Sequence, residues 1–245
     1  MLQTEYTILI EISQPMGGSA ESQLAMVRSL RAKQFKGNSS EEVSVLYRAL
    51  SEISDVIGEI IMLKSSTQIA VDDSSPELGS LYAIFVEGCG EILSIKIDGI
   101  QDWTLLGFQQ RARPSSDFRA VGSLALNHIH GFAKSRPEMF SKIVLESSAA
   151  PSTVWYPFAL SCIHVTNFLI NSLLNRQLQH AIFKSRCVRG TSVSELLLDI
   201  FSGHVIGFHS YWLENVELGR VKTTLDFEDV FDEYKWTVLE TLYKF

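Results

Sequence analysis

The segment Trp103–Lys134 reads WTLLGFQQRARPSSDFRAVGSLALNHIHGFAK, and it joins the most distinctive loop of the chain to an apolar helical pattern. From Val121 onward, apolar side chains recur at spacings of three and four residues, which predicts a helix with one buried face. We expect Ser116 or Asp117 to cap this helix at its start. Arg119 lies between the polar loop and the apolar run, a placement that suits an arginine acting on a partner.

Helical patterns also precede this segment. Ser39 and Glu42 can form a capping box ahead of an apolar stripe that continues to Ile61, which predicts a long amphipathic helix. Ser75 followed by Pro76 is typical of another helix start. The short alternation at 92–97 fits either a strand or an extended connector, and no second strand accompanies it.

The pattern after the segment is also helical. Pro137 and Pro157 are each expected to begin a helix, and no proline follows Pro157. Apolar residues between Val193 and Trp212 mark a further helix, and Asp226 is expected to cap the last one. We therefore predict an all-α fold with one multi-helix domain over residues 39–245. Residues 1–38, interrupted by Pro15 and two glycines, form a short N-terminal appendage of uncertain structure.

Composition narrows the functional classes. The chain has 245 residues, 46% of them hydrophobic, so it can bury a substantial core and is not expected to be disordered. Its net charge is −7 and its pI is about 5.4, which argues against binding along a nucleic-acid backbone. A basic partner surface is compatible with this charge.

The cysteines and apolar segments indicate a reducing compartment. Three widely spaced cysteines, without a Cys-x-x-Cys pair, favour neither a disulfide framework nor a zinc site. The N-terminus does not resemble a secretory signal. The longest apolar segment, Phe158–Ile170, falls short of the roughly 20 residues that a membrane span needs. We expect a cytoplasmic protein.

The sequence gives little support for a metal site, a hydrolase or a nucleotide-binding loop. His128 and His130 are two positions apart and would point to different faces of a helix, so a metal site is disfavoured. The chain has neither a Gly-x-Ser-x-Gly nucleophile motif nor a glycine-rich phosphate loop. From the residues alone, two interpretations of Arg119 stay open: it pairs with Asp117 or a core carbonyl and fixes the loop, or it acts on a partner.

The loop resembles the signature of the ELMO (engulfment and cell motility) domain family, and specifically of its short ELMO-domain-containing members. In that signature, Trp-x3-Gly-Phe-Gln is followed by a polar loop and by Pro-x-Thr-Asp-Phe-Arg-Gly-x-Gly. The positions that match in order are Trp103, Gly107, Phe108, Gln109, Pro114, Asp117, Phe118, Arg119 and Gly122. Tyr156-Pro157-Phe158-Ala159 resembles a later landmark of the family. This chain departs from the pattern at Ala120, where glycine is usual, and at Ser116, where threonine is usual.

The resemblance implies a GTPase-activating protein for Arf or Arf-like small GTPases in membrane traffic, in which Arg119 is the catalytic arginine finger. It is a GTPase activator with no chemistry of its own: the GTP-bound partner hydrolyses the nucleotide, and neither a cofactor nor a metal is expected here. The alternative is a non-catalytic adaptor that binds a small GTPase or a Rac exchange factor. Membrane proximity at organelles would come only through the partner.

The resemblance and the residue types also suggest roles within the loop. We expect Gln109, Ser116 and Asp117 to contact the partner or orient the loop. The residues expected to anchor the loop are Trp103, Gly107, Phe108, Pro114 and Phe118, since large aromatic side chains are usually buried.

Overall fold

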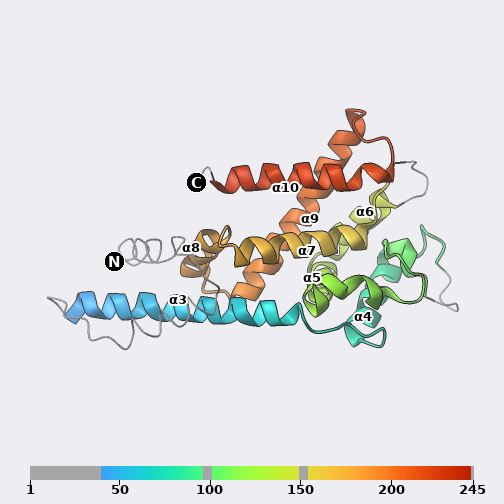
Figure 1. Ribbon diagram of the computed structural model, residues 1–245. Helices are drawn as coiled ribbons and strands as arrows, with labels where there is room; N and C mark the ends of the chain where they lie inside the picture. The colour runs from blue at the N-terminus through green and yellow to red at the C-terminus, as the bar shows by residue number, and fades with distance from the viewer. Residues whose placement is uncertain (1–39, 96–100, 149–153, 244–245) are drawn as a thin grey trace. The chain divides into compact units, whose positions relative to one another are not determined.

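The computed structural model describes residues 40–95, 101–148 and 154–243, and every regular element in these ranges is a helix (Figure 1). This confirms the all-α prediction. The predicted appendage over 1–38 and the cap residue Ser39 lie outside the described residues. In the ambiguous stretch 92–97, residues 92–94 form a turn and not a strand, with a φ of 53° at Ser94, and residues 96–97 lie outside the described residues. The chain divides into two compact units, the first made of Met1–Ser65 and Ile170–Leu197 and the second of Ser66–Leu169 and Leu198–Phe245.

The first unit contains α3 (Ser40–Ser66) up to Ser65, α8 (Gln179–Arg189) and the adjoining ends of two other helices. The predicted stripe of α3 is buried at Leu50, Ile53 and Ile60, among others. Arg186 of α8 donates hydrogen bonds to the carboxylates of Glu52 and Glu59. The second oxygen of Glu59 accepts the backbone N–H of Val193 at 2.6 Å, so one carboxylate joins three segments of this unit.

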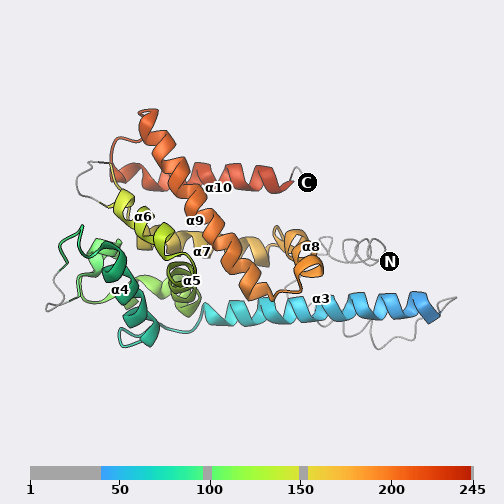
Figure 2. The ribbon, with the colours of Figure 1, turned by 180° about the vertical axis from the view of Figure 1, so that it is seen from behind.

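The second unit begins with three helices that contact one another: α4 (Pro76–Cys89), α5 (Gly122–Ser135) and α6 (Pro137–Ser147). Figure 2 shows α4 and α6 beside α5. The predicted starts at Pro76 and Pro137 are confirmed. Each proline occupies the first helical turn, where its missing N–H leaves no backbone hydrogen bond unmade.

The second unit is completed by the first part of α7 (Phe158–Leu174), most of α9 (Val193–Glu217), and α10 (Phe227–Tyr243). Their shared core is aromatic. Phe208 of α9 lies at its centre, with ring centroids 5.1–6.3 Å from its aromatic neighbours. These neighbours are Tyr156, Trp212, Phe227, Phe231 and Tyr234. None of the described helices is long and apolar enough to cross a membrane.

Buried polar side chains in this unit bond to one another. His128 of α5 and Thr166 of α7 are joined by a hydrogen bond of 3.1 Å, and burial lowers the pKa of His128 to about 4. The Tyr156 hydroxyl lies 2.9 Å from Nδ1 of His209, whose Nε2 lies 2.8 Å from a carboxylate oxygen of Glu146. These bonds satisfy groups that would otherwise be costly to bury.

The predicted start of α5 is wrong. A 3₁₀ turn, η2 (Pro114–Ala120), occupies the region of the expected caps, and α5 begins at Gly122 without a side-chain cap. Instead, Ser123 donates its N–H to the carbonyl of Ile69 at 2.9 Å and its hydroxyl to that of Ser66 at 3.1 Å. Carbonyls distant in sequence thus replace the local cap.

At the last helix, the prediction that Asp226 caps α10 is wrong, because its carboxylate bonds to backbone N–H groups that precede it. Thr223 and Asp226 form a capping box on the 3₁₀ turn η3 (Thr224–Asp226), and α10 begins one residue later. The Asp226 carboxylate accepts the backbone N–H groups of Lys222 and Thr223 at 2.7 and 2.9 Å.

Candidate functional site

The loop that carries Arg119 begins with a second 3₁₀ turn, η1 (Trp103–Leu106). Asp102 caps this turn by accepting the Thr104 N–H at 3.2 Å. The other carboxylate oxygen of Asp102 lies 2.9 Å from Nε of Arg111. The backbone N–H of Trp103 donates to the Arg111 carbonyl at 3.0 Å, which brings the two ends of the polar segment together. The loop is therefore a closed structure on the surface.

Three aromatic side chains fix the loop to the second unit. Trp103, Phe108 and Phe118 are each buried, with at most 3% of their surface exposed. Their rings form a continuous series with Tyr82 of α4. The ring centroids are separated by 5.0 Å between Tyr82 and Trp103, by 5.4 Å between Trp103 and Phe108, and by 5.6 Å between Phe108 and Phe118. Pro114 is also buried. These four predicted anchors lie in the protein interior, as large apolar groups usually do.

Gly107, the fifth predicted anchor, is required for two reasons. Its φ is 92°, in the left-handed region that favours glycine. A Cβ atom at this position would lie 2.5 Å from the backbone nitrogen of Phe158 and 2.8 Å from the carbonyl carbon of Pro157. The loop therefore contacts the first residues of α7 directly, backbone against backbone. The Gly107 contact sets the position of the loop relative to this helix.

Ser116 and Asp117 organise the turn internally. One carboxylate oxygen of Asp117 accepts the backbone N–H of Gln109 at 2.8 Å, which links the two sides of the loop. The Ser116 hydroxyl lies 2.9 Å from the Arg113 carbonyl and 3.3 Å from the other oxygen of Asp117. Both side chains thus make hydrogen bonds within the loop, and their predicted roles in orienting it or contacting a partner stay predictions.

Arg119 is exposed, and its guanidinium is only partly engaged. Its Nε donates to the backbone carbonyl of Ser116 at 2.7 Å. Within the described parts of the chain, its two terminal nitrogens make neither a hydrogen bond nor a salt bridge. Since a guanidinium offers five N–H donors, four remain available to another molecule. Arg119 does not pair with Asp117 in this structure.

Arg119 lines a pocket of about 370 Å³, formed within the second unit. We call it the Arg119 pocket. One side is the loop, which contributes three of the predicted site residues besides Arg119. The opposite side is α7. The lining residues are Gln109, Ser116, Asp117, Arg119 and Ala120 from the loop, and Leu160, Ile163, His164 and Asn167 from α7.

The α7 wall was missed at the sequence level. Its four residues are spaced by three, one and three positions, as on one face of a helix. The polar residues His164 and Asn167, three positions apart and therefore on one face of the helix, are the signal that could have found this face. His164 is partly exposed, with its Nε2 3.9 Å from a carboxylate oxygen of Glu228 and its ring edge-on to Phe227 and Phe231.

The departure from the family pattern at Ala120 causes no backbone strain. Ala120 ends η2, and its φ is not positive, so a Cβ is tolerated there. The left-handed position follows two residues later, at Gly122, with a φ of 50°. A Cβ on Gly122 would lie 2.5 Å from the Ile69 carbonyl oxygen.

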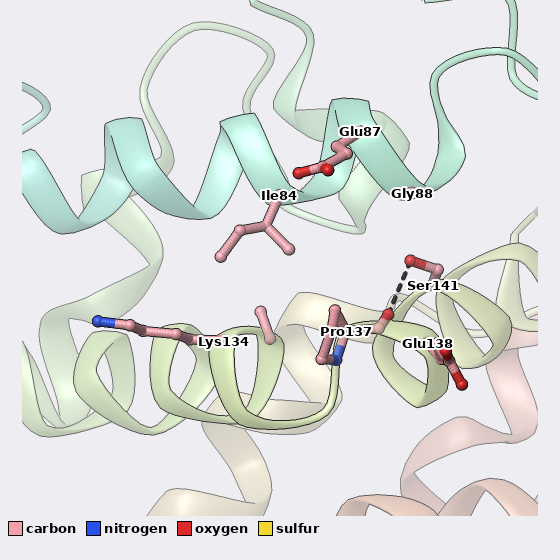
Figure 3. A pocket seen from close by; sticks show the side chains of 8 residues that line it. Ile84, Glu87, Gly88, Lys134, Pro137, Glu138 and Ser141 are labelled. Atoms are coloured by element: carbon pink, nitrogen blue, oxygen red, sulfur yellow. Dashed lines mark hydrogen bonds between the residues drawn. The ribbon is translucent and has the colours of Figure 1, made fainter.

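A second hollow, of about 490 Å³, lies between α4, α5 and α6 (Figure 3). The Ser141 hydroxyl there donates to the Pro137 carbonyl at 2.9 Å. A Cβ on Gly88 would lie 1.9 Å from the same hydroxyl oxygen, which shows how closely α4 approaches α6. This hollow contains none of the predicted site residues, so it supplies control positions for tests of the Arg119 pocket.

The histidines and cysteines of the described residues have structural surroundings. His128 is buried, whereas His130 is partly exposed and bonded to Ser80 at 2.9 Å. The thiols of Cys89 and Cys162 are free and buried, and burial raises the pKa of both. Among the residues that the structure describes, no group of three or more His, Cys, Asp or Glu side chains is placed to hold a metal ion.

Comparison with known proteins places this geometry in a family. A segment of 70 residues is 37% identical to the ankyrin repeat and ELMO domain-containing protein D of Dictyostelium discoideum, covering 29% of this chain and 5% of that protein. No solved structure matches the chain. The model of the ELMO/CED-12 family matches residues 65–231, more than half of the chain and all of the Arg119 pocket. The chain therefore belongs to the ELMO/CED-12 family.

Proposed function

We propose that this protein is a GTPase-activating protein for a small GTPase of the Arf or Arf-like group, and that Arg119 supplies positive charge to the transition state. The observation that carries the proposal is the exposed guanidinium of Arg119, with both terminal nitrogens unengaged at the edge of a pocket. The resemblance of the Asp117-Phe118-Arg119 motif to that of the activating family members supports the choice of arginine.

The chemistry of GTP hydrolysis explains how one arginine can suffice. Negative charge spreads over the phosphoryl oxygens in the transition state, and a guanidinium from a partner stabilises it without transferring a proton. Such an arginine accelerates hydrolysis by about 10³ to 10⁵ in GTPases generally. The nucleotide and Mg²⁺ would belong to the GTPase, so this protein would contribute only the charge and a surface that positions it.

The neighbours of Arg119 would position this charge. The Ser116 carbonyl holds Nε, and Asp117 ties the turn to the backbone of Gln109. Because these bonds use the backbone of the loop, the terminal nitrogens can point to a partner while the rest of the side chain stays in place. Gln109 and the α7 residues His164 and Asn167 line the same pocket and would contact the GTPase.

The decisive assay is single-turnover GTP hydrolysis by a panel of purified Arf and Arf-like GTPases. We expect Arg119→Ala to abolish the stimulation. Arg119→Lys should fail nearly as badly, because an ammonium cannot present the planar fork of donors. Arg136→Ala is the matched control, since Arg136 is also exposed but follows α5, outside the pocket. Equal stimulation by wild type and Arg119→Ala across the panel would reject catalysis.

A non-catalytic adaptor would use the same face differently. The hydrogen bond from Nε of Arg119 to the Ser116 carbonyl holds this side chain along the loop. This arrangement also fits a protein that binds a GTPase without using Arg119 in catalysis. In that case the GTP-bound partner would bind wild type and Arg119→Ala with similar affinity, and neither would change the hydrolysis rate. Titration of a fluorescent GTP analogue on the GTPase separates binding from stimulation.

A further inference from the structure

The loop beside Arg119 also has the features of a phosphorylation site. Ser116 is preceded by arginines at two positions, Arg111 five residues earlier and Arg113 three residues earlier. Protein kinases that select basic substrates recognise arginine at these two distances before the acceptor serine, because acidic pockets on the kinase bind the guanidinium groups. Both arginines are exposed, and Ser116 lies at the surface in the Arg119 pocket.

The neighbouring Ser115 does not fit this pattern. It follows the same arginines by four and two residues, and its backbone N–H is bonded to Asp73 at 3.0 Å. Ser115 therefore provides a control within the same turn. A difference in phosphorylation between the two serines would not come from their exposure, because both are partly exposed.

Ser116 and Arg119 lie on the same face of η2. In a 3₁₀ helix, side chains three positions apart are eclipsed, and these two residues have that separation. The guanidinium already contacts the carbonyl of Ser116, with Nε 2.7 Å from the oxygen. A phosphate on the Ser116 hydroxyl would thus be next to the two free terminal nitrogens of Arg119, and the pocket of about 370 Å³ leaves room for it.

We propose that Ser116 accepts a phosphoryl group from an arginine-selective protein kinase, and that the resulting phosphoserine binds the Arg119 guanidinium and withholds it from the partner. The γ-phosphoryl group of ATP is transferred to Oγ of Ser116. The bond to the bridging oxygen of ADP breaks, a P–O bond to serine forms, and the hydroxyl proton passes to the catalytic base of the kinase. The regulatory consequence rests on the proposed function, whereas the modification itself does not.

Charge explains why the phosphoserine would bind Arg119. A phosphoserine carries about −1.5 to −2 charges at pH 7 and offers three strong acceptor oxygens. Its bonds to a guanidinium are charge-assisted and can be bidentate, so they are stronger than the present bond to a neutral carbonyl. The phosphate would also repel the carboxylate of Asp117, now 3.3 Å from the Ser116 hydroxyl, and weaken the tie to Gln109.

The kinase needs the acceptor in an extended conformation, and the loop can provide it by opening locally. The segment between the buried rings of Phe108 and Phe118 is held by surface hydrogen bonds, including Gln109 to Asp117. The main cost is the release of Pro114, which is buried. Local openings of this kind occur well below the free energy of global unfolding.

The first test is phosphate incorporation into the intact full-length protein. The enzyme is a purified kinase domain that selects arginine five and three residues before serine, and mass spectrometry locates the phosphate. We expect stoichiometric phosphate at Ser116, unchanged incorporation in Ser115→Ala, none in Ser116→Ala, and at least a tenfold slower reaction in Arg113→Ala. Phosphate at Ser115, or none on the folded chain, would overturn the proposal.

The second test asks whether the phosphate binds Arg119, and it does not depend on any GTPase. A ³¹P NMR titration measures the second pKa of the phosphoserine, which is about 6 without partners. A nearby guanidinium should lower this pKa, since opposite charge favours the dianion. We expect the pKa to be about one pH unit lower in wild type than in Arg119→Ala. Equal values would show that the phosphate does not bind Arg119 and would overturn the proposal.

The third measurement connects the modification to function. GTPase stimulation by the phosphorylated protein should fall to the level of Arg119→Ala, and a phosphatase should restore it. Undiminished stimulation would overturn the regulatory consequence. If the unmodified protein stimulates no GTPase, the proposed function fails. Incorporation and the ³¹P titration would still decide whether Ser116 is a modification site whose phosphate binds Arg119.

Discussion

Gly107→Ala tests whether the loop and α7 are joined as closely as the structure indicates. The new methyl group would lie 2.5 Å from the backbone nitrogen of Phe158, about 1 Å inside the normal contact range of 3.5–4.0 Å. Neither backbone can move aside without shifting the loop or the start of α7. The left-handed φ of 92° adds a second penalty, since a Cβ is disfavoured there.

The two contributions can be estimated separately. A left-handed residue other than glycine costs about 1–2 kcal/mol, and overpacking by one methyl group costs roughly 1–3 kcal/mol. Together they predict that the free energy of unfolding falls by about 2–5 kcal/mol, a large share of the 5–15 kcal/mol that is usual for a domain. Because the loop carries Arg119, we also expect any GTPase stimulation to fall.

Two other glycines separate these contributions. Gly219 has a φ of 68°, but a methyl group there would have nothing within 4 Å, so Gly219→Ala carries the strain without the clash. Gly79 lies inside α4, also without close neighbours, and Gly79→Ala should stabilise the helix by about 0.5–1 kcal/mol. Urea unfolding of the three variants, at matched m-values, measures the differences. If Gly107→Ala lowers the free energy of unfolding no more than Gly219→Ala does, the close approach of the loop to α7 would be refuted.

Two further predictions concern pH and surface charge. Burial depresses the His128 pKa from 6.5 to about 4, so its stabilising effect is complete above pH 6.5 and is lost as the pH falls toward 4. Between pH 7.5 and 5, urea unfolding should show a loss of about 2 kcal/mol of unfolding free energy from this group. His128→Asn should reduce the pH dependence without removing it, because burial also lowers the pKa of His204 to about 4; a pH dependence equal to that of wild type would contradict the assignment. Arg111→Ala removes an ion pair with Asp102 in which the arginine side chain is 67% exposed. Because exposed ion pairs contribute little, urea unfolding should show a loss of unfolding free energy below about 1 kcal/mol. A loss above about 2 kcal/mol would contradict this prediction.

The positions of helices were predictable from the sequence where residues close together in the chain determine them. Pro76 and Pro137 mark helix starts because proline fits only the first turn, and the stripe that ends at Ile61 follows from burial of one face of α3. The start of α5 was not predictable in this way. The N–H of Ser123 in its first turn donates to the carbonyl of Ile69, a contact that depends on tertiary structure.

The candidate site shows the same division. The burial of the aromatic side chains was predictable because large rings are usually buried, whereas the contact of the exposed Arg119 with a partner stays a prediction. The specific role of Asp117 was not predictable, since its carboxylate bonds to a backbone group eight residues earlier rather than to the following helix. His164 and the α7 wall join the loop only in three dimensions.

The ring series from Tyr82 through Trp103 and Phe108 to Phe118 has a consequence for recognition. A flexible surface segment usually loses much conformational freedom when it docks, and this loss weakens association. Here the tilted and edge-to-face rings already hold the segment in one arrangement before any encounter. On the proposed function, discrimination among related GTPases would then come from the few side chains at the rim, such as Gln109, and would show mainly in the dissociation rate of each complex.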